Sequence, residues 1–204
     1  AREYPDEAVG NIVKIFHKAE EEKEFDSAKF DDYIMPFSIE AAAVCLIKRG
    51  STMKNIVDIL SRKWGKEYIQ LVVTGCGFGS YGINPDKILT DFNCPKEQIE
   101  WFIDGYGCKM GLEKFFNNKD VHFPSYPQRK PIVRGLGRCV TFIPNEENTK
   151  EKYKKYFEFF ELYPEDKEDY YFGVGFSLAF TKSPHKLEGF LKSYEEQFKG
   201  DELY

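Results

Sequence analysis

The chain has 204 residues, which is long enough to bury a sizeable core in one compact domain or one elongated repeat array. Hydrophobic residues make up 42% of it and aromatic residues 17%, so an intrinsically disordered chain is excluded. The net charge of −5 and the pI near 5.4 argue against nucleic acid as a partner, because nucleic-acid-binding proteins carry a concentrated basic surface.

The N-terminal region predicts a helix over about residues 6–24. The chain begins Ala1-Arg2 without an initiating Met or a signal-peptide pattern, so we expect that residues upstream are missing. The longest uncharged stretch, residues 68–85, is rich in Gly and shorter than the ~20 apolar residues that span a membrane. We therefore expect no membrane span, and one domain over residues 1–204.

An apolar run that contains Gly-x-Gly recurs four times, at residues 70–82, 100–111, 131–142 and 169–180. A weaker copy at 35–47 has Glu40 and Ala42 at the two Gly positions. The first Gly-equivalents are at positions 40, 75, 105, 135 and 173, so the spacings are 35, 30, 30 and 38 residues. Repeats of this length accommodate two helices per unit.

The first full copy, LVVTGCGFGSYG at 71–82, also matches the Gly-x-Gly-x-x-Gly pattern of a nucleotide-binding loop, through Gly77, Gly79 and Gly82. That pattern requires a strand before the glycines and a long helix that starts among them. Asn84-Pro85 follows almost at once, and a phosphate loop does not explain four copies. We favour helix packing as the role of these glycines over phosphate binding.

Glycine inside a helix costs about 1 kcal/mol relative to alanine, so two per helix require a gain from packing. Small residues four apart lie on one helix face and allow a neighbouring backbone to approach closely. The pairs with this spacing are Gly75 with Gly79, Gly107 with Gly111, and Gly175 with Ala179, and Gly82 continues the first row. Each such face is expected to contact the neighbouring unit.

The second helix of each unit is more polar. Residues 51–64 have helical periodicity with Ser51 as the expected N-cap, and residues 149–161 form another such helix. Asn84-Pro85 and Ser183-Pro184 each read as a cap followed by proline at the first helical position. No clean alternating run predicts a strand. The predicted fold is all-α: an α-solenoid-like array of about five helix pairs packed through Gly-x-Gly helices.

Four charged residues lie inside the Gly-bearing helices, at Glu40, Asp104, Arg134 and Arg138. A charge in an apolar helix is normally paired, because burying it alone costs several kcal/mol. Asp104 and Arg134 occupy the same register in successive repeats, so we expect them to be in contact. These four residues, with Tyr106, form either a buried ionic network, which we favour, or a ligand-facing polar site.

Metal and cofactor sites are not expected. His17, His122 and His185 lie in separate regions without a partner at metal-ligand spacing, so neither a metal nor a cofactor is predicted. The five cysteines are an odd number without a Cys-x-x-Cys pair. Reduced thiols in a cytoplasmic protein are therefore favoured over disulfides, with a secreted protein that has one unpaired thiol as the alternative.

Two further segments have both a structural and a functional interpretation. The proline-rich loop 117–131 is either a connector, which we favour, or a lid over a groove. The charges of 152–166, from Lys152 to Asp166, are expected to form a solvated helix face. The aromatic residues of 153–160 recur at helical spacing, which favours a core role over an aromatic ligand-binding groove.

The order of these motifs resembles a bacterial family of unknown function that recurs in gene clusters for enediyne polyketides. The resemblance covers residues 9–180. Its strongest motifs are Asp104-Gly105-Tyr106-Gly107, Gly135-Leu136-Gly137-Arg138 and Gly173-Val174-Gly175. It implies an accessory role in natural-product biosynthesis or handling, and a segment before residue 1. Where the family often has His-Glu, this chain has Cys108-Lys109-Met110, which argues against acid–base chemistry there.

Together these patterns predict a non-catalytic helical-repeat protein that binds a protein partner or a hydrophobic small molecule, because repeat arrays create extended concave surfaces. The alternative is an enzyme that acts on a polyketide-like intermediate. It would place Asp104, Arg134 and Arg138 in a groove for acid–base chemistry.

Overall fold

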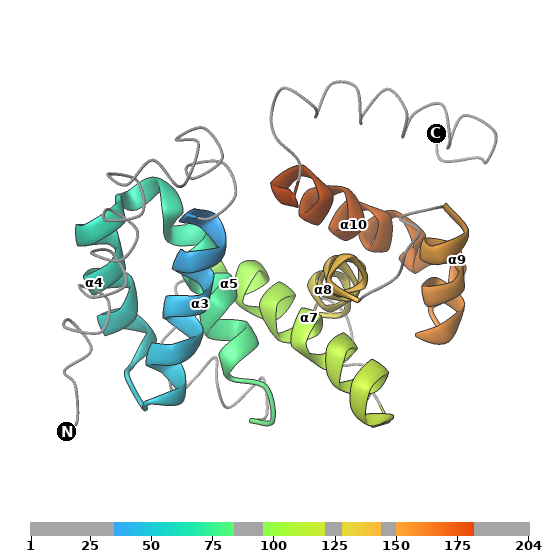
Figure 1. The fold of residues 1–204 in the computed structure, drawn as a ribbon, viewed down its shortest axis with the longest axis horizontal. Helices are drawn as coiled ribbons and strands as arrows, with labels where there is room; N and C mark the ends of the chain where they lie inside the picture. The colour runs from blue at the N-terminus through green and yellow to red at the C-terminus, as the bar shows by residue number, and fades with distance from the viewer. Residues whose placement is uncertain (1–34, 84–95, 121–127, 144–149, 182–204) are drawn as a thin grey trace, which may run out of the picture. The chain divides into compact units, whose positions relative to one another are not determined.

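The computed structural model describes residues 35–83, 96–120, 128–143 and 150–181 (Figure 1). These residues are 84% helical and contain no strand, so the predicted all-α class is confirmed for them. The chain forms two compact units, residues 1–102 and 103–204. The predicted helix at 6–24, the helices expected after Asn84-Pro85 and Ser183-Pro184, and the three histidines lie outside the described residues.

In the first unit, α3 (Met35–Lys48) packs along α5 (Ile69–Gly79), and α4 (Met53–Trp64) lies against both (Figure 1). A 3-10 turn at Lys66–Tyr68 leads into α5. The three helices bury apolar side chains, because each is apolar on the side that faces the others. The fully buried members include Ile39, Leu46, Ile56, Leu60 and Val73.

The ends of α4 show how local sequence sets its bounds. Its N-cap is Thr52, whose hydroxyl accepts a hydrogen bond from the backbone N–H of Asn55 at 3.3 Å. The predicted cap, Ser51, is therefore wrong by one residue. The helix stops at Gly65, which has a φ of 107° and donates its N–H to the carbonyl of Ser61. Glycine adopts this left-handed φ without the steric cost that a Cβ would bring.

Helix α5 contains most of the segment that resembles a nucleotide-binding loop. Residues 71–77 are buried within the helix, and a 3-10 turn rather than a strand precedes it, so the packing interpretation is confirmed. The helix ends at Gly79, and Ser80 closes it by donating its hydroxyl to the carbonyl of Cys76 at 2.7 Å. Gly82 lies beyond the helix with a φ of 100°. It does not continue the packing row, because the chain has already turned.

The second unit is built around α8 (Arg129–Phe142) and α10 (Lys167–Thr181), which lie side by side, with α9 (Lys150–Phe159) against both (Figure 1). Helix α7 (Ile99–Asn117) follows a 3-10 turn at Lys96–Gln98, and most of α7 belongs to this unit. A second 3-10 turn, Pro164–Asp166, leads into α10. The fully buried residues of this core include Ile132, Leu136, Val140, Phe160, Tyr170 and Val174.

We call the helices that contain the repeated motif, α3, α5, α7, α8 and α10, the Gly helices. In α5, α8 and α10, the first glycine of the Gly-x-Gly pair lies against the backbone of the preceding Gly helix. A Cβ added at Gly75 would meet the carbonyl oxygen of Glu40, one at Gly135 that of Asp104, and one at Gly173 that of Arg134. Asp104 and Arg134 each directly precede the first glycine of their own helix. Only a residue without a side chain allows this approach, which explains why the helices retain glycine despite its cost.

In α5, α7 and α8, the second glycine of the Gly-x-Gly pair lies against the backbone of the following Gly helix. A Cβ at Gly77 would meet the carbonyl oxygen of Phe102, one at Gly107 that of Ile132, and one at Gly137 that of Tyr170. Each of these carbonyls belongs to the residue three before the first glycine of its helix. The contacts of the first glycine and of the second glycine are thus two parts of one contact, which recurs between consecutive Gly helices within each unit.

This recurrence corrects the register of the weakest repeat copy. Because the carbonyl of Glu40 meets Gly75, Glu40 corresponds to Asp104 and Arg134, which directly precede a first glycine. The two glycine positions are therefore taken by Ala41 and Ala43, one residue later than predicted. The prediction failed because alanines occupy 41–43 without interruption, so the sequence alone gives no fixed point for the alignment.

Candidate functional site: a row of arginine–aspartate pairs on α8

Three arginines of α8, at positions 129, 134 and 138, share one arrangement. Each guanidinium hydrogen-bonds an aspartate and lies over an aromatic ring. Arginine suits both contacts, because its planar, permanently charged group binds carboxylates and stacks on aromatic faces. All of these partners belong to the second unit, and most come from α10 and the turn before it.

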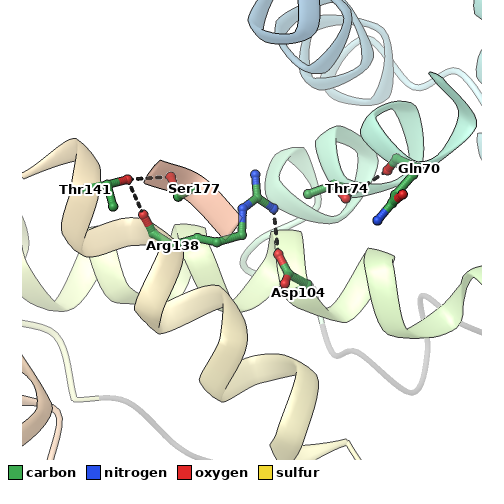
Figure 2. A network of polar contacts seen from close by, with 6 residues as sticks. All are labelled: Gln70, Thr74, Asp104, Arg138, Thr141 and Ser177. Carbon is green, nitrogen blue, oxygen red and sulfur yellow. Dashed lines mark hydrogen bonds and ion pairs between the residues drawn. The ribbon is translucent and has the colours of Figure 1, made fainter. Parts of the chain in front are cut away.

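The innermost pair joins Arg138 to Asp104 of α7. The Nη1 of Arg138 donates to Oδ1 of Asp104 at 2.6 Å (Figure 2), and both side chains are at least 96% buried. The guanidinium lies 5.7 Å from the ring centroid of Phe176. Removing one partner of a buried pair leaves an uncompensated charge, which typically costs about 3–5 kcal/mol.

Burial is the main influence on the carboxyl group of Asp104. It raises the pKa above the ordinary value of 3.8, because an ionised carboxylate is poorly solvated in the protein interior. The charge and the hydrogen bond of Arg138 lower the pKa of Asp104, and the charge of Arg134 lowers it further. The pair therefore balances a large desolvation cost against a short, charge-assisted hydrogen bond.

The middle pair is more open to solvent. The Nε of Arg134 donates to Oδ1 of Asp169 at 2.9 Å, and the guanidinium lies 5.5 Å from the ring centroid of Phe172. Lys130, one helical turn earlier, is 4.0 Å from the same carboxylate. The outer position of this pair makes it less costly to rearrange than Arg138–Asp104.

The third pair fixes the turn that leads into α10. Arg129 Nε donates to Oδ1 of Asp166 at 2.9 Å, and its Nη2 binds the other carboxylate oxygen. Asp166 also accepts the backbone N–H of Tyr163 at 2.9 Å, and the guanidinium lies 4.7 Å from the Tyr163 ring centroid. Such bidentate geometry gives directional specificity in addition to charge attraction. One arginine thus orders both the turn and its aromatic residue.

Beyond Arg138, two hydroxyl groups join α8 to α10. Thr141 lies 2.8 Å from the carbonyl of Arg138, to which it donates, and 2.5 Å from the hydroxyl of Ser177 (Figure 2). With the Thr141 proton on the carbonyl, Ser177 donates to Thr141. The polar groups between these helices are used in contacts with one another.

The structure brings together three of the predicted site residues. Asp104, Arg134 and Arg138 lie in one neighbourhood, but the hydrogen bonds join Asp104 to Arg138 and Arg134 to Asp169. Tyr106 is half-buried and lies two residues after Asp104, on another side of α7. Glu40 is half-buried on α3 in the first unit.

Three participants were missed by the sequence interpretation. Arg129 and Asp169 were not singled out, and Asp166 stands in the charged stretch 152–166 that predicts a solvated face. Asp166 is only 1% exposed, so that prediction is wrong at this position. It is also wrong for Lys152, which is buried and donates to the carbonyl of Ile143 at 2.9 Å.

The four cysteines among the described residues do not form a reactive centre. Cys76, Cys108 and Cys139 are buried reduced thiols, and Cys45 is an exposed reduced thiol. Burial raises the pKa of Cys139 well above its ordinary value, so its thiol stays protonated and a poor nucleophile. In the part of the chain that the structure describes, no three His, Cys, Asp or Glu side chains are grouped to hold a metal ion.

A group of aromatic residues reaches the surface where the end of α7 meets α9. The ring centroid of Phe115 lies 4.9 Å from that of Phe116 and 6.4 Å from that of Phe159. Phe116 is 61% exposed and Phe159 37% exposed, whereas Tyr156 beneath them is buried. Lys114 lies over the Phe159 ring at 5.3 Å. We call Phe116 and Phe159 the exposed aromatic pair. The expectation that the aromatic residues of 153–160 are core thus holds for most of them and fails at Phe159.

Comparison of the chain with models of known protein families, with curated proteins and with solved structures gave no match. No helix among the described residues is both long enough and apolar enough to cross a membrane.

Proposed function

We propose that this protein is a non-catalytic helical-repeat protein that binds a partner protein, or a hydrophobic small molecule, through aromatic side chains on its surface. The observation that carries the proposal is a contrast in burial: the charged residues are enclosed, whereas large aromatic side chains are exposed. Asp104 and Arg138 are buried against each other, whereas Phe116 and Phe159 are presented to solvent. Large aromatic residues dominate the energetics of protein interfaces, while a carboxylate enclosed with its counter-ion is poorly placed to exchange protons with substrate.

The α-solenoid-like array is part of this proposal. The reciprocal glycine contacts recur in both units, as expected of repeats that each pack on their neighbours. In such an array the Gly helices form the internal stack, and the polar second helices α4 and α9 lie outside it. Phe159 of α9 is then on the outer side, and Phe116 is exposed at the end of α7, so a partner can reach both rings.

The enzyme alternative needs a groove that opens onto Asp104, Arg134 and Arg138. Burial of Asp104 and Arg138 counts against it. The resemblance to proteins of enediyne polyketide clusters supports a hydrophobic small molecule as a second kind of ligand. A cytoplasmic location is part of the same proposal, because buried reduced thiols such as Cys139 suit a reducing compartment.

The proposal is tested with a thermal-shift screen of polyene fatty acids and aromatic polyketides, run on the wild type and a Phe116→Ser/Phe159→Ser variant. A matched control is Phe142→Ser, which removes a 38%-exposed aromatic ring at the end of α8. We expect stabilisation by a subset of compounds that the double variant loses and the control retains. No stabilisation of the wild type across the panel would exclude the small-molecule form of the proposal.

The partner-protein form is tested by affinity capture with the same three proteins as bait. We expect a partner that is retained by the wild type and by Phe142→Ser and is lost with the double variant. Equal capture by all three proteins would contradict a role for the exposed aromatic pair. An Arg138→Met variant that folds normally but loses binding would instead favour the polar site.

A further inference from the structure

The exposed aromatic pair lies beside a positive charge from α7. The ammonium nitrogen of Lys114 is 5.3 Å from the ring centroid of Phe159, and the Lys114 side chain is only 15% exposed. Phe159 in turn packs edge to face against Phe115 and Tyr156. A cation that is mostly withdrawn from water at an aromatic surface is stabilised by an anion nearby. The surface at the exposed aromatic pair is therefore not purely apolar.

The counter-ion of Lys114 is loosely held. Its one ion pair with a described residue is to Oε2 of Glu161 at 3.9 Å, which is longer than a hydrogen bond, and the Glu161 side chain is 85% exposed. By contrast, Lys109 of α7 is 2.8 Å from the carboxylate of Glu113, whose side chain is 13% exposed. A long, exposed ion pair contributes little to stability. A second carboxylate can therefore replace that of Glu161.

Glu161 occupies a backbone position that favours glycine. Its φ is 54°, and its N–H donates to the carbonyl of Glu158 at 2.9 Å, while the N–H of Leu162 donates to the carbonyl of Phe157 at 3.4 Å. These two bonds form a Schellman motif at the end of α9, where glycine avoids the steric cost that a side chain brings. An unfavourable residue at such a position points to a role for its side chain. That side chain marks where an anion meets Lys114.

An anion from solution can reach Lys114. The Glu161 side chain is mostly in solvent and still comes within 3.9 Å of the ammonium nitrogen, so the approach is open. The exposed aromatic pair adjoins this approach, because Phe159 lies beneath the ammonium group and Phe116 is joined to it through the ring of Phe115. A molecule with its anionic end at Lys114 therefore covers exposed rings with its apolar part.

We propose that the exposed aromatic pair binds an amphipathic monocarboxylate of the medium-chain fatty acid type. The carboxylate of the ligand replaces that of Glu161 at Lys114, and its hydrocarbon chain covers the rings of Phe116 and Phe159. The inference rests on the small-molecule form of the proposed function and names the class of ligand.

Charge complementarity selects this ligand over the alternatives. A neutral amphipath covers the rings without using the cation, and Lys114 repels a cationic one. The exposed charges of Lys155 and Glu158 on α9 are three residues apart and opposite in sign, so they do not change this preference. A membrane surface fits less well, because a single carboxylate can enter beside a side chain that is 15% exposed, whereas a layer of lipid head groups cannot.

The test is calorimetric titration of the full chain with decanoate, 1-decanol and decylammonium near pH 8. These ligands share one chain length and differ in the charge of the head group. We expect decanoate to bind about tenfold more tightly than decanol, as for a hydrogen bond to a charged group, and decylammonium to bind most weakly. The advantage of decanoate over decanol should decrease with added salt, because salt screens partly exposed charges.

Substitutions separate the charge from the apolar surface. Lys114→Met keeps an unbranched side chain and should bind decanoate no more tightly than decanol, whereas Lys114→Arg should keep the preference. Glu161→Gln removes the competing carboxylate, so it should tighten decanoate severalfold and leave decanol unchanged. The control Lys54→Met removes an exposed positive charge from α4 in the first unit and should change neither affinity. If Lys114→Met melts below the wild type, Glu161→Gln still decides the question, because it acts in the opposite direction.

The outcomes distinguish this inference from the proposed function. Equal affinity for decanoate and decanol, both lost with Phe116→Ser/Phe159→Ser, would overturn the inference and leave the small-molecule form of the proposed function intact. Absence of binding by all three ligands would count against both. Decanoate binding that survives the double serine variant would place the ligand elsewhere and contradict the inference. Binding of phosphatidylglycerol vesicles without binding of free decanoate would replace it with a membrane surface.

Discussion

In the second unit, Arg138 depends strongly on its partner, because its charge is buried together with that of Asp104. We expect Arg138→Met to lower the free energy of unfolding by about 3–5 kcal/mol, since it leaves a buried carboxylate without its partner. Asp104→Leu combined with Arg138→Met should recover much of this loss, because two apolar side chains need no solvation. Chemical denaturation of the single and double variants measures both effects.

The penalty of Arg138→Met should depend on pH. Asp104 already has a pKa raised above 3.8 in the folded state, and loss of Arg138 removes the two influences that lower it most. A group whose pKa is raised by folding is most compatible with the fold when protonated, below its unfolded pKa. The variant should therefore be least destabilised near pH 4 and lose further stability as the pH rises through the folded-state pKa. A penalty that is constant from pH 4 to pH 8 would contradict this assignment.

Replacing each of two tyrosines of the second unit with phenylalanine removes one hydroxyl group, so the two variants can be compared directly. The hydroxyl of Tyr153 is buried without a hydrogen-bond partner among the described residues, whereas Tyr170 donates to the carbonyl of Tyr153 at 2.9 Å. We expect Tyr153→Phe to be neutral or stabilising at pH 7 and Tyr170→Phe to cost about 1 kcal/mol. Thermal denaturation of both variants under one condition makes the comparison, and the reverse order would contradict it.

The same deletion should change the response to alkali. Burial raises the pKa of Tyr153 to about 12, so the folded state holds this proton more tightly than the unfolded chain does. That contribution to stability is complete below pH 10 and is lost as the pH rises from 10 toward 12. Tyr153→Phe should therefore lose less stability than the wild type over this range, measured by denaturation at pH 9, 10 and 11.

At the scale of elements, the Gly helices are distinguished by what their glycines contact. A Cβ at Gly77, Gly135 or Gly173 would collide with a backbone carbonyl of the neighbouring helix, which cannot move aside as a side chain can. We expect alanine at each of these positions to destabilise the fold, although alanine favours an isolated helix by about 1 kcal/mol. Alanine at Gly175 should instead be neutral or stabilising. Thermal melts of the four variants test the contrast.

The sequence predicted the elements well where periodicity was strong. The Gly helices and the polar helices α4 and α9 were placed with bounds correct to within three residues, except that α7 ends at Asn117, six residues after its motif. Apolar spacing and caps predict helix positions because they are local signals. Register was harder to predict. The alignment of Ala41 and the N-cap Thr52 each differ by one residue from the prediction, since neighbouring alanines or neighbouring hydroxyl residues are equivalent in local sequence.

The sequence identified several residues of the candidate site, but it did not predict which aspartate pairs with which arginine. Asp104, Arg134 and Arg138 were singled out because a charge in an apolar helix needs a partner. The partner of Arg134, Asp169, stands in a charged stretch where burial has no local signal. Which aspartate meets which arginine depends on the crossing of α8 with α7 and α10, and helix crossing is a tertiary property.

At the scale of the whole molecule, the proposed array predicts local rather than global responses to damage. Each repeat of an array contacts only its neighbours, so stability is close to a sum over nearest-neighbour contacts. Gly75→Leu should open the contact between α3 and α5 and leave the amide protection of α8 and α10 unchanged. Hydrogen exchange of the variant and the wild type measures this, and uniform loss of protection in both units would argue for a single cooperative core.

The glycine contacts also affect how relatives of this protein can be recognised. In each contact, a glycine, which has no side chain, lies against a backbone carbonyl group of a neighbouring helix. Every amino acid has such a carbonyl group. Substitution can therefore change the residues that flank the contact, such as Glu40, Asp104 and Arg134, without changing the interface itself. A search by the spacing of paired small residues should reach relatives that overall residue identity does not.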